Sequence, residues 1–331
     1  MRRVFVYEYL SGGGQMASAG KSGDTPGGEL LAMGRAMRDA IVADLLQLED
    51  YDVSVAACEL AATVPEAASA VMPQPRESAF DFVARQADAH HGVWVVAPET
   101  DGLLSQFQRR VDPARWLGCD GPSTAVASGK RSTLTRLAEA GVSTPLAFEN
   151  APEVTRWVVK PDDGAGAVDT RVHASLEAAL ADAAQRTRSR SRSTSSSGAW
   201  VIEPWVEGEA LSLSLMCSAG RSELLSINRQ HLLIDTQGVL SYRGVDVNVL
   251  PPDDPRTATL AAWAARIGQN VPGLCGFVGV DLVWHAQRGP VAIEINPRVT
   301  CAYVGLSRAL GRNLAAEVIA AQRRREAGRD A

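Results

Sequence analysis

The chain has 331 residues, enough for two or three packed units, and its 46% hydrophobic and 21% charged residues are ordinary for a globular protein. Its formal net charge of −5 at pH 7 gives no electrostatic reason to expect a nucleic-acid partner. The five cysteines are scattered and lack CxxC spacing, so we expect reduced thiols in a cytoplasmic protein. Because no apolar stretch reaches about 20 residues, we expect neither export nor membrane insertion.

The first third of the chain alternates strands with helices. We expect strands at 3–9, 52–57 and 93–97, with helices at 29–48 and 78–89. This alternation predicts a small parallel sheet with right-handed crossovers. Ligands of such sheets lie beyond the carboxyl ends of the strands. Glu8 and Glu99 follow the first and third strands, so both are candidate substrate-binding residues.

The pattern changes near residue 119. A helix is predicted over 128–140, with Ser128 as its N-cap and Gly141 just past its end. A strand at 157–160, a loop and a helix at 175–184 are expected to follow. The next residues, 185–198, are a Ser/Arg-rich run that cannot bury enough apolar surface to order itself. We expect a mobile and dispensable insertion there, in preference to a phosphorylated RNA-binding tract.

The last third of the chain is rich in strands. We expect strands at 199–203, 211–217, 223–228, 277–284 and 291–296, and helices at 255–270 and 313–325. Asp254 caps the first of these helices and Pro255 occupies its first turn. The last two strands are almost wholly apolar and are joined by a short turn, which predicts a buried hairpin.

Three polar side chains interrupt this hairpin. Glu294 and Asn296 are two residues apart and point to the same face, and Asp281 can meet them across the strands. Burying two carboxylates together is unfavourable unless a cation neutralises them. Two carboxylates and an amide suit Mg²⁺ or Mn²⁺ with phosphate oxygens, and Arg298 can lie beside them as an anion clamp. The hairpin therefore predicts a metal–triphosphate site; the alternative is an edge hairpin whose carboxylates face water.

A lysine and a glycine-rich loop indicate a second part of this site. Lys160 ends a predicted strand, and Gly164 and Gly166 lie in the loop that follows. Glycines let backbone N–H groups approach phosphate oxygens, and the lysine supplies a cation. The pattern alone is also compatible with a simple turn.

A competing phosphate site lies near the N-terminus. Residues 14–22 resemble a P-loop that would use Lys21. The P-loop has four residues between its glycines and a helix starting at the lysine, whereas this segment has five, and a Gly-Asp-Thr-Pro-Gly-Gly stretch follows it. We therefore expect Lys21 to be replaceable.

Polar groups also mark the exits of other strands. Glu203 and Val206 offer a carboxylate and exposed backbone, which suit an adenine between apolar walls, although a plain strand-to-turn transition has the same pattern. Glu209 could accept a hydrogen bond from a ribose hydroxyl. Arg229 could hold a γ-phosphate, and we assign no catalytic role to His231.

In chain order these motifs resemble the ATP-grasp superfamily over roughly residues 90–315. The matching elements are a helical lysine, a lysine before a glycine loop, Glu-Pro-Trp-Val with Gly-Glu, a strand aspartate and Glu-x-Asn-x-Arg. The resemblance implies that Lys130 and Lys160 contact ATP phosphates, that Glu203 and Val206 flank the adenine and that Glu209 binds the ribose. It also implies that Asp281, Glu294 and Asn296 hold two Mg²⁺ ions, with Arg298 facing the transferred phosphoryl group.

The resemblance implies a three-part architecture. Residues 1–118 would form a parallel α/β domain, residues 119–205 a small subdomain and residues 206–331 a catalytic subdomain. The second and third parts are both α+β and would clamp ATP between them. We also consider a homodimer.

Within the superfamily, three stretches are similar to the tyramine–glutamate ligases of methanofuran biosynthesis and their bacterial relatives. They begin at Val6 (VYEYLSGG), Val95 (VVAPETDGLL) and Ser226 (SINRQH). The similarity implies an ATP-dependent ligase that joins small-molecule carboxylate and amine substrates, most simply glutamate and tyramine, through an acyl phosphate. The alternatives are another amino-acid or peptide ligase, an ATP-binding protein without turnover, and a P-loop NTPase that uses Lys21.

Overall fold

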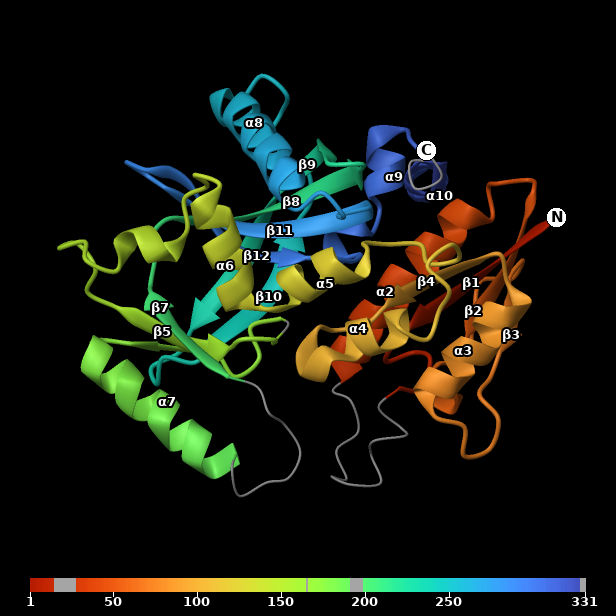
Figure 1. The fold of residues 1–331 in the computed structure, drawn as a ribbon, viewed down its shortest axis with the longest axis horizontal. Helices are drawn as coiled ribbons and strands as arrows, with labels where there is room; N and C mark the ends of the chain where they lie inside the picture. Colours follow the sequence, from red (N-terminus) through yellow and green to blue (C-terminus); the bar gives the residue numbers. More distant parts are fainter. Residues whose placement is uncertain (15–27, 165, 191–198, 328–331) are drawn as a thin grey trace.

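The computed structural model describes residues 1–14, 28–164, 166–190 and 199–327. Three sheets organise these residues: one of four strands, one of three and one of five. Figure 1 shows the four-stranded sheet in one half of the molecule and the other two sheets in the other half. The predicted P-loop-like segment falls mostly on residues 15–27, which lie outside the described residues.

The four-stranded sheet is parallel, as the sequence predicts. Its order is β3 (Ser69–Val71), β2 (Tyr51–Ala56), β1 (Arg2–Glu8) and β4 (Gly92–Val96). Helices α2 (Gly28–Leu45) and α3 (Ala79–Ala89) both contact β1. The sequence analysis missed β3, because only three residues pair and none of them is buried.

The three-stranded sheet is antiparallel, in the order β6 (Arg171–His173), β5 (Trp157–Pro161) and β7 (Trp200–Pro204). Helix α7 (Leu176–Arg190) packs Ala179 and Ala183 against Val159 of β5.

The prediction that this helix ends at residue 184 is wrong, because α7 continues to Arg190. Arg186 forms an i,i+4 ion pair with Asp182 at 2.9 Å, and its guanidinium lies 4.8 Å from the ring centre of Trp200. These contacts stabilise the turn that follows Ala184. The rest of the Ser/Arg-rich run, 191–198, lies outside the described residues.

The five-stranded sheet is antiparallel and contains the predicted hairpin. Its order is β10 (Leu240–Asp246), β9 (Arg221–Ile234), β8 (Glu209–Ser218), β11 (Gly276–His285) and β12 (Gly289–Asn296). Helix α8 (Pro255–Asn270) covers one face, where Leu260, Trp263 and Ile267 join Val278, Val280 and Leu282 in one core. Asp254 caps α8 as predicted, its carboxylate accepting from the Arg256 N–H at 2.9 Å. The opposite face of the sheet is the one that carries Asp281 and is not covered by α8.

Two helices occupy the region where the sequence predicts one. They are α5 (Gly121–Ser128) and α6 (Lys130–Glu139), separated by Gly129 in an extended conformation. The assignment of Ser128 as an N-cap is therefore wrong, because Ser128 ends α5 and Gly129 precedes α6. Gly141 adopts a positive φ of 70° just past the helix end, as predicted.

The end of the chain returns to its beginning. Helix α4 (Leu103–Gln108) belongs to the N-terminal half. The last helices of the described residues are α9 (Leu306–Leu310) and α10 (Leu314–Ala327). One core contains Val4 and Ile41 from the N-terminal sheet and α2 together with Tyr303 and Val318 from the C-terminal region. Among the described residues, none of the helices combines the length and the apolar character needed to cross a membrane.

Candidate active site

The hairpin brings its three polar side chains together. Asp281 of β11 lies opposite Glu294 of β12 in the ladder, and the Asn296 amide donates to Asp281 Oδ2 at 3.4 Å. The register shifts by one residue directly after Asp281. Such a bulge turns neighbouring side chains in new directions. The grouping expected from the sequence is therefore present in the structure.

The charges of the two carboxylates are unequal. Burial and the neighbouring Glu294 raise the pKa of Asp281 well above its ordinary value. Burial by itself would raise the pKa of Glu294, but the cationic Lys130 and Lys160 outweigh it and lower that pKa. The two carboxylates therefore interact and titrate as a pair, in two separate steps.

These oxygen donors fit a divalent cation of the Mg²⁺ type. The group contains only two carboxylates, and the third donor is an amide. In the described parts of the chain no cluster of three or more His, Cys, Asp or Glu side chains is arranged to hold a metal ion. Any ion at Asp281, Glu294 and Asn296 would therefore need ligands from water or phosphate.

Lys130 faces this carboxylate pair. Its Nζ lies 3.2 Å from Glu294 Oε2 and also donates to the carbonyl oxygen of Gly164. Burial would lower the pKa of Lys130, but Glu294 raises it. One buried lysine therefore joins the hairpin to the glycine loop.

The glycine loop also caps the helix that carries Lys130. Asp162 accepts from the Arg131 N–H through its side chain at 2.8 Å and from the Lys130 N–H through its carbonyl at 2.9 Å. The N-cap residue Gly129 offers no side-chain oxygen, so these N–H groups are satisfied from a distant loop. A Cβ on Gly129 would approach Ser132 Oγ to 2.6 Å, so a side chain there would require the Ser132 hydroxyl to move.

Lys160 and Glu203 form a buried ion pair between β5 and β7. Glu203 Oε2 has no hydrogen-bond partner among the described residues, so this carboxylate has a free acceptor. Lys160 also acts electrostatically on Glu294. The pair therefore lies close enough to the hairpin to belong to the same site.

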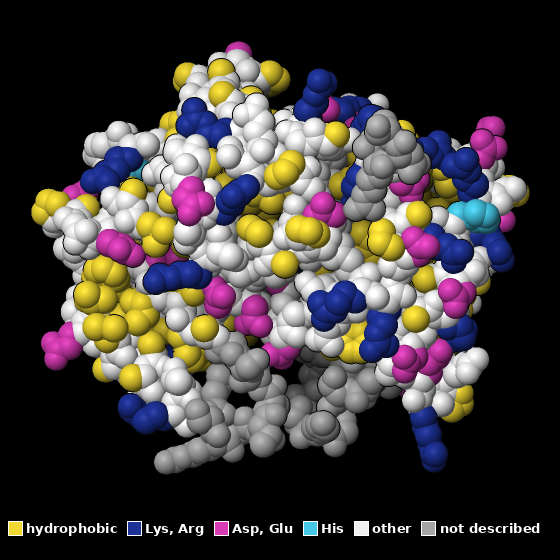
Figure 2. All heavy atoms as spheres, in the orientation of Figure 1, with side chains coloured by type: hydrophobic (Ala, Val, Ile, Leu, Met, Phe, Trp, Pro, Cys, Tyr) yellow, Lys and Arg dark blue, Asp and Glu magenta, His cyan; other side chains and the backbone are white. Residues whose placement is uncertain are grey.

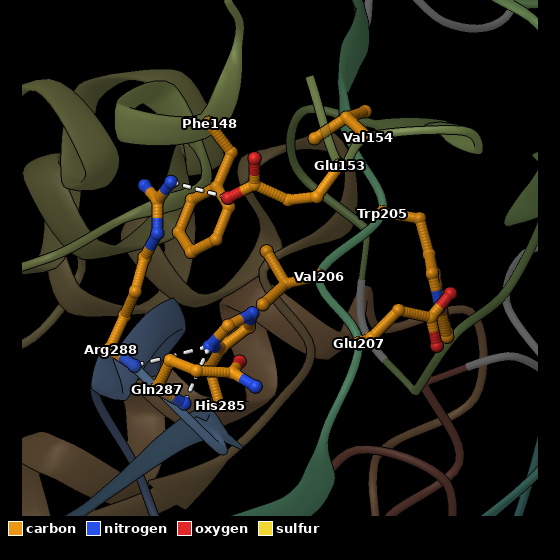
Figure 3. A pocket seen from close by; sticks show the side chains of 9 residues that line it. All are labelled: Phe148, Glu153, Val154, Trp205, Val206, Glu207, His285, Gln287 and Arg288. Carbon is orange, nitrogen blue, oxygen red and sulfur yellow. Dashed lines mark hydrogen bonds and ion pairs between the residues drawn. The ribbon is translucent and has the colours of Figure 1, made fainter. Parts of the chain in front are cut away.

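Val206 lies at the connection between β7 and β8. Its side chain packs with Phe148 and Val291. A cavity of about 360 Å³ lies here. Among the side chains that line it, Figure 3 shows Val206 and His285 on one side and the Glu153–Arg288 ion pair across from them. Neither Lys130 nor Glu294 lines this cavity, so it is separate from the charged group.

Glu209 and Arg229 do not join that group. Arg229 donates to Glu209 Oε1 and Arg256 of α8 donates to Glu209 Oε2, each at 2.8 Å. Arg229 lies opposite Leu211, whose side chain is in the core under α8.

The strand register places them on the other face of the sheet. Asp281 lies opposite Ser212, three residues from Glu209 on β8, and alternation puts positions three apart on opposite faces. The sequence analysis grouped Glu209 and Arg229 with the nucleotide; the structure instead places them behind the sheet. Their contacts with ribose and γ-phosphate stay predictions that this geometry does not favour.

The residues that the sequence analysis missed lie on the Asp281 face. Asn228 is fully buried and bonds Ser214 and Ser226, and the Gln230 side chain bonds Asp281. Strand alternation from Asn228 could have placed Gln230 on the same face of β9 as Asn228, beside the predicted metal ligands. It could not have shown that the strands pair in this register.

Arg298 follows the hairpin and pairs with Glu99 at 2.9 Å. The predicted substrate residue Glu99 thus reaches the hairpin from the N-terminal half. Glu8 is buried, and its two oxygens accept from the Leu10 and Ser11 N–H groups at 3.1 and 2.8 Å. The structure gives Glu8 a role in this turn, and its contact with substrate stays a prediction.

Two antiparallel sheets and a parallel α/β half therefore meet at buried lysines and paired carboxylates. This arrangement defines an α/β protein in which buried lysines and carboxylates gather between its sheets. A family model described as the ATP-grasp domain matches residues 127–302, and one described as the pre ATP-grasp 3 domain matches residues 51–126. The chain belongs to the ATP-grasp family, which confirms the predicted fold class.

Solved structures share this fold at low sequence identity. A putative ATP-grasp superfamily protein from Archaeoglobus fulgidus is 20% identical with a TM-score of 0.66, over 97% of this chain and 88% of that one. An L-amino acid ligase from Bacillus licheniformis is 15% identical with a TM-score of 0.65, over 97% and 75% of the two chains. The D-alanine–D-alanine ligase from Bacillus anthracis complexed with ATP is 13% identical with a TM-score of 0.63, over 98% of both. No curated protein sequence matches this chain.

Proposed function

We propose that this protein is an ATP-dependent ligase that joins a carboxylate to an amine through an acyl phosphate, releasing ADP and phosphate. The observation that carries the proposal is the contact of Lys130 with both Glu294 and the glycine loop at Gly164. This contact joins three parts of a triphosphate site that are far apart in the sequence.

The chemistry follows from charge placement. A carboxylate oxygen of the acid attacks the γ-phosphorus, and ADP leaves with the bridging oxygen. The amine nitrogen then attacks the acyl carbon, loses a proton and displaces phosphate. Lys130, Lys160 and Arg298 stabilise the negative charge that develops on the transferring oxygens.

Asp281, Glu294 and Asn296 would hold Mg²⁺ or Mn²⁺. Such an ion neutralises phosphate charge and orients the triphosphate. The side-chain oxygens are fixed in position, because Asp281 accepts a hydrogen bond from Asn296 and Glu294 forms an ion pair with Lys130. Glu203 and the backbone at Val206 would face the adenine.

The finer proposal is that glutamate is the acid and tyramine or a similar amine the acceptor, in a methanofuran-type cofactor pathway. It is supported by the stretches that begin at Val6, Val95 and Ser226. The first two stretches begin in strands β1 and β4 and run past their carboxyl ends, and the third lies on β9, which β8 separates from the hairpin. An amino-acid or peptide ligase of other specificity is the second candidate.

The test is ADP formation with a panel of acids and amines that includes glutamate and tyramine. We expect turnover only when both an acid and an amine are present. Glu294→Gln should reduce the rate by at least about 100-fold, since it removes a charge at the centre of the site, while circular dichroism stays unchanged. An ATP-binding protein without turnover would bind ATP and release no ADP with any pair.

A further inference from the structure

The glycine loop contacts the N-terminal half through Asp163. Asp163 Oδ2 accepts a hydrogen bond from the Asp101 N–H at 2.8 Å, although the two residues are 62 positions apart. Asp101 lies in the short 3-10 turn Thr100–Gly102 that follows β4, and its φ of 53° is left-handed. A residue other than glycine keeps this conformation only where surrounding contacts hold it. The glycine loop therefore supplies one of the contacts that fix this turn.

The same turn is also joined to the end of the hairpin. Glu99 directly precedes the turn and forms a buried ion pair with Arg298 at 2.9 Å. The hairpin is joined to the glycine loop as well, since Lys130 contacts both Glu294 and the Gly164 carbonyl. The N-terminal half, the glycine loop and the hairpin are therefore each linked to the other two.

Three parts linked in a closed circuit stabilise one another's positions. When two of the links are formed, the groups of the third are already close, so the third link costs less entropy than it would between free parts. The hydrogen bond between Asp101 and Asp163 is the most accessible of these links, because Asp101 is exposed and Asp163 is half-buried. Such a bond adds little to stability. Its loss should therefore affect ligand binding more than folding.

We infer that Asp163 is a positioning residue that couples ATP binding to binding of the acid substrate. ATP bound at the glycine loop favours the hydrogen bond between Asp163 and Asp101, and this bond orders the N-terminal half, where the acid would bind. The effect is reciprocal, because two coupled ligands change each other's affinity by the same factor. The inference rests on the proposed ligase function and concerns the regulation of that site.

The first test needs only the nucleotide. Hydrogen exchange of the Asp101 amide is followed by mass spectrometry, with and without Mg²⁺ and a non-hydrolysable ATP analogue. In the wild type we expect the analogue to slow this exchange about fivefold or more. Asp163→Ala should abolish the slowing, whereas Asp163→Asn, which keeps an acceptor oxygen, should retain part of it.

Asp112→Ala is the matched control. Asp112 is exposed in the same half, and its carboxylate accepts from the Ala114 N–H at 2.9 Å, so the variant removes a hydrogen bond of the same kind. This variant should keep the full slowing. The inference is overturned if the analogue binds without changing Asp101 exchange in the wild type, or if Asp163→Ala shows the same slowing.

The second test separates coupling from a purely structural role. It uses the acid of a pair that supports ADP formation, and calorimetry gives the Kd of the ATP analogue with and without that acid. We expect the acid to tighten analogue binding about tenfold in the wild type and hardly at all in Asp163→Ala. If Asp163 only stabilised the loop, its loss would weaken analogue binding equally with and without the acid, and the inference would be wrong.

The inference and the ligase function fail separately. ADP release from an acid–amine pair without any coupling leaves the ligase standing and rejects the role of Asp163. Slowed exchange at Asp101 without ADP release from any pair supports the coupling and rejects the ligase. Failure of the analogue to bind rejects both.

Discussion

At the scale of single residues, the site depends on how buried charges are paired. Glu294 is held by Lys130, whereas no lysine of the described residues forms an ion pair with Asp281, whose pKa is raised. The Lys160–Glu203 ion pair is more deeply buried than the Lys130–Glu294 pair. A buried pair of this kind adds little net stability, but breaking it leaves a charge without compensation.

Lys160→Ala should therefore destabilise the protein by about 3–5 kcal/mol, because Glu203 would remain buried without its cation. Urea unfolding followed by circular dichroism measures the change. Replacing both residues, as Lys160→Ala with Glu203→Ala, should recover part of this loss.

The control is Arg110→Ala, which removes a pair whose side chains are 50% and 66% exposed. That change should cost less than about 1 kcal/mol. A similar loss for Arg110→Ala and Lys160→Ala would show that burial of the Lys160–Glu203 pair does not determine its role.

At the scale of elements, the start of α6 decides where Lys130 lies. The helix begins at Lys130 because Asp162 of the glycine loop supplies the cap that Gly129 cannot. Anything that moves this loop therefore moves the first turn of the helix. If the loop binds phosphate as proposed, Asp162 would link phosphate binding to the position of α6.

Asp162→Ala should cost about 1 kcal/mol of stability, as loss of a helix cap does. It should also weaken ATP binding several-fold, since Lys130 occupies the first helical position. Urea midpoints and calorimetric ATP titration measure the two effects.

Asp120→Ala is the matched control. Asp120 caps α5 by accepting from the Ser123 N–H at 2.8 Å. Its loss should cost similar stability without changing ATP affinity. If the two variants affect ATP binding equally, the cap of α6 has no special connection to the phosphate site.

At the scale of the whole molecule, α2 and the C-terminal helices share one core. Buried Asp44 of α2 accepts from the Tyr303 hydroxyl at 2.6 Å and from Ser307, and Asn313 donates to its carbonyl at 2.8 Å. The N-terminal and C-terminal halves are therefore joined by this core and by buried polar contacts. On the face in Figure 2, basic and acidic side chains of the described residues are interspersed.

The Asp44 contacts predict a pH dependence of stability. Burial raises the pKa of Asp44 above its ordinary value of 3.8, although the hydrogen bonds from Ser307 and Tyr303 oppose the shift. A carboxyl with a raised folded-state pKa contributes stability below its ordinary pKa, and this contribution is lost as the pH rises through the folded-state value. The unfolding free energy of the wild type, minus that of Asp44→Asn, should therefore fall as the pH rises from about 4 and then level off.

Urea unfolding of both proteins at several pH values measures this difference. Parallel curves would mean that Asp44 does not titrate differently on folding. A difference that grows with pH would mean that the hydrogen bonds from Tyr303 and Ser307 outweigh burial.

The sequence by itself determined the features that local pattern controls. The alternation of the first third predicted the parallel sheet, and Asp254 with Pro255 predicted the start of α8. The spacing of Glu294 and Asn296 predicted that they share a face, because strand alternation depends only on neighbours along the chain. The short turn between the two strands predicted that Asp281 can meet them across the hairpin.

Only the tertiary structure decided which distant groups meet. It moved the start of α6 from Ser128 to Lys130, because the cap comes from Asp162, over thirty positions away. It turned Glu209 and Arg229 behind the sheet and brought Glu99 to Arg298, 199 positions apart. Periodicity gives the faces of one strand, whereas the register between strands and the packing of the two halves depend on the whole chain.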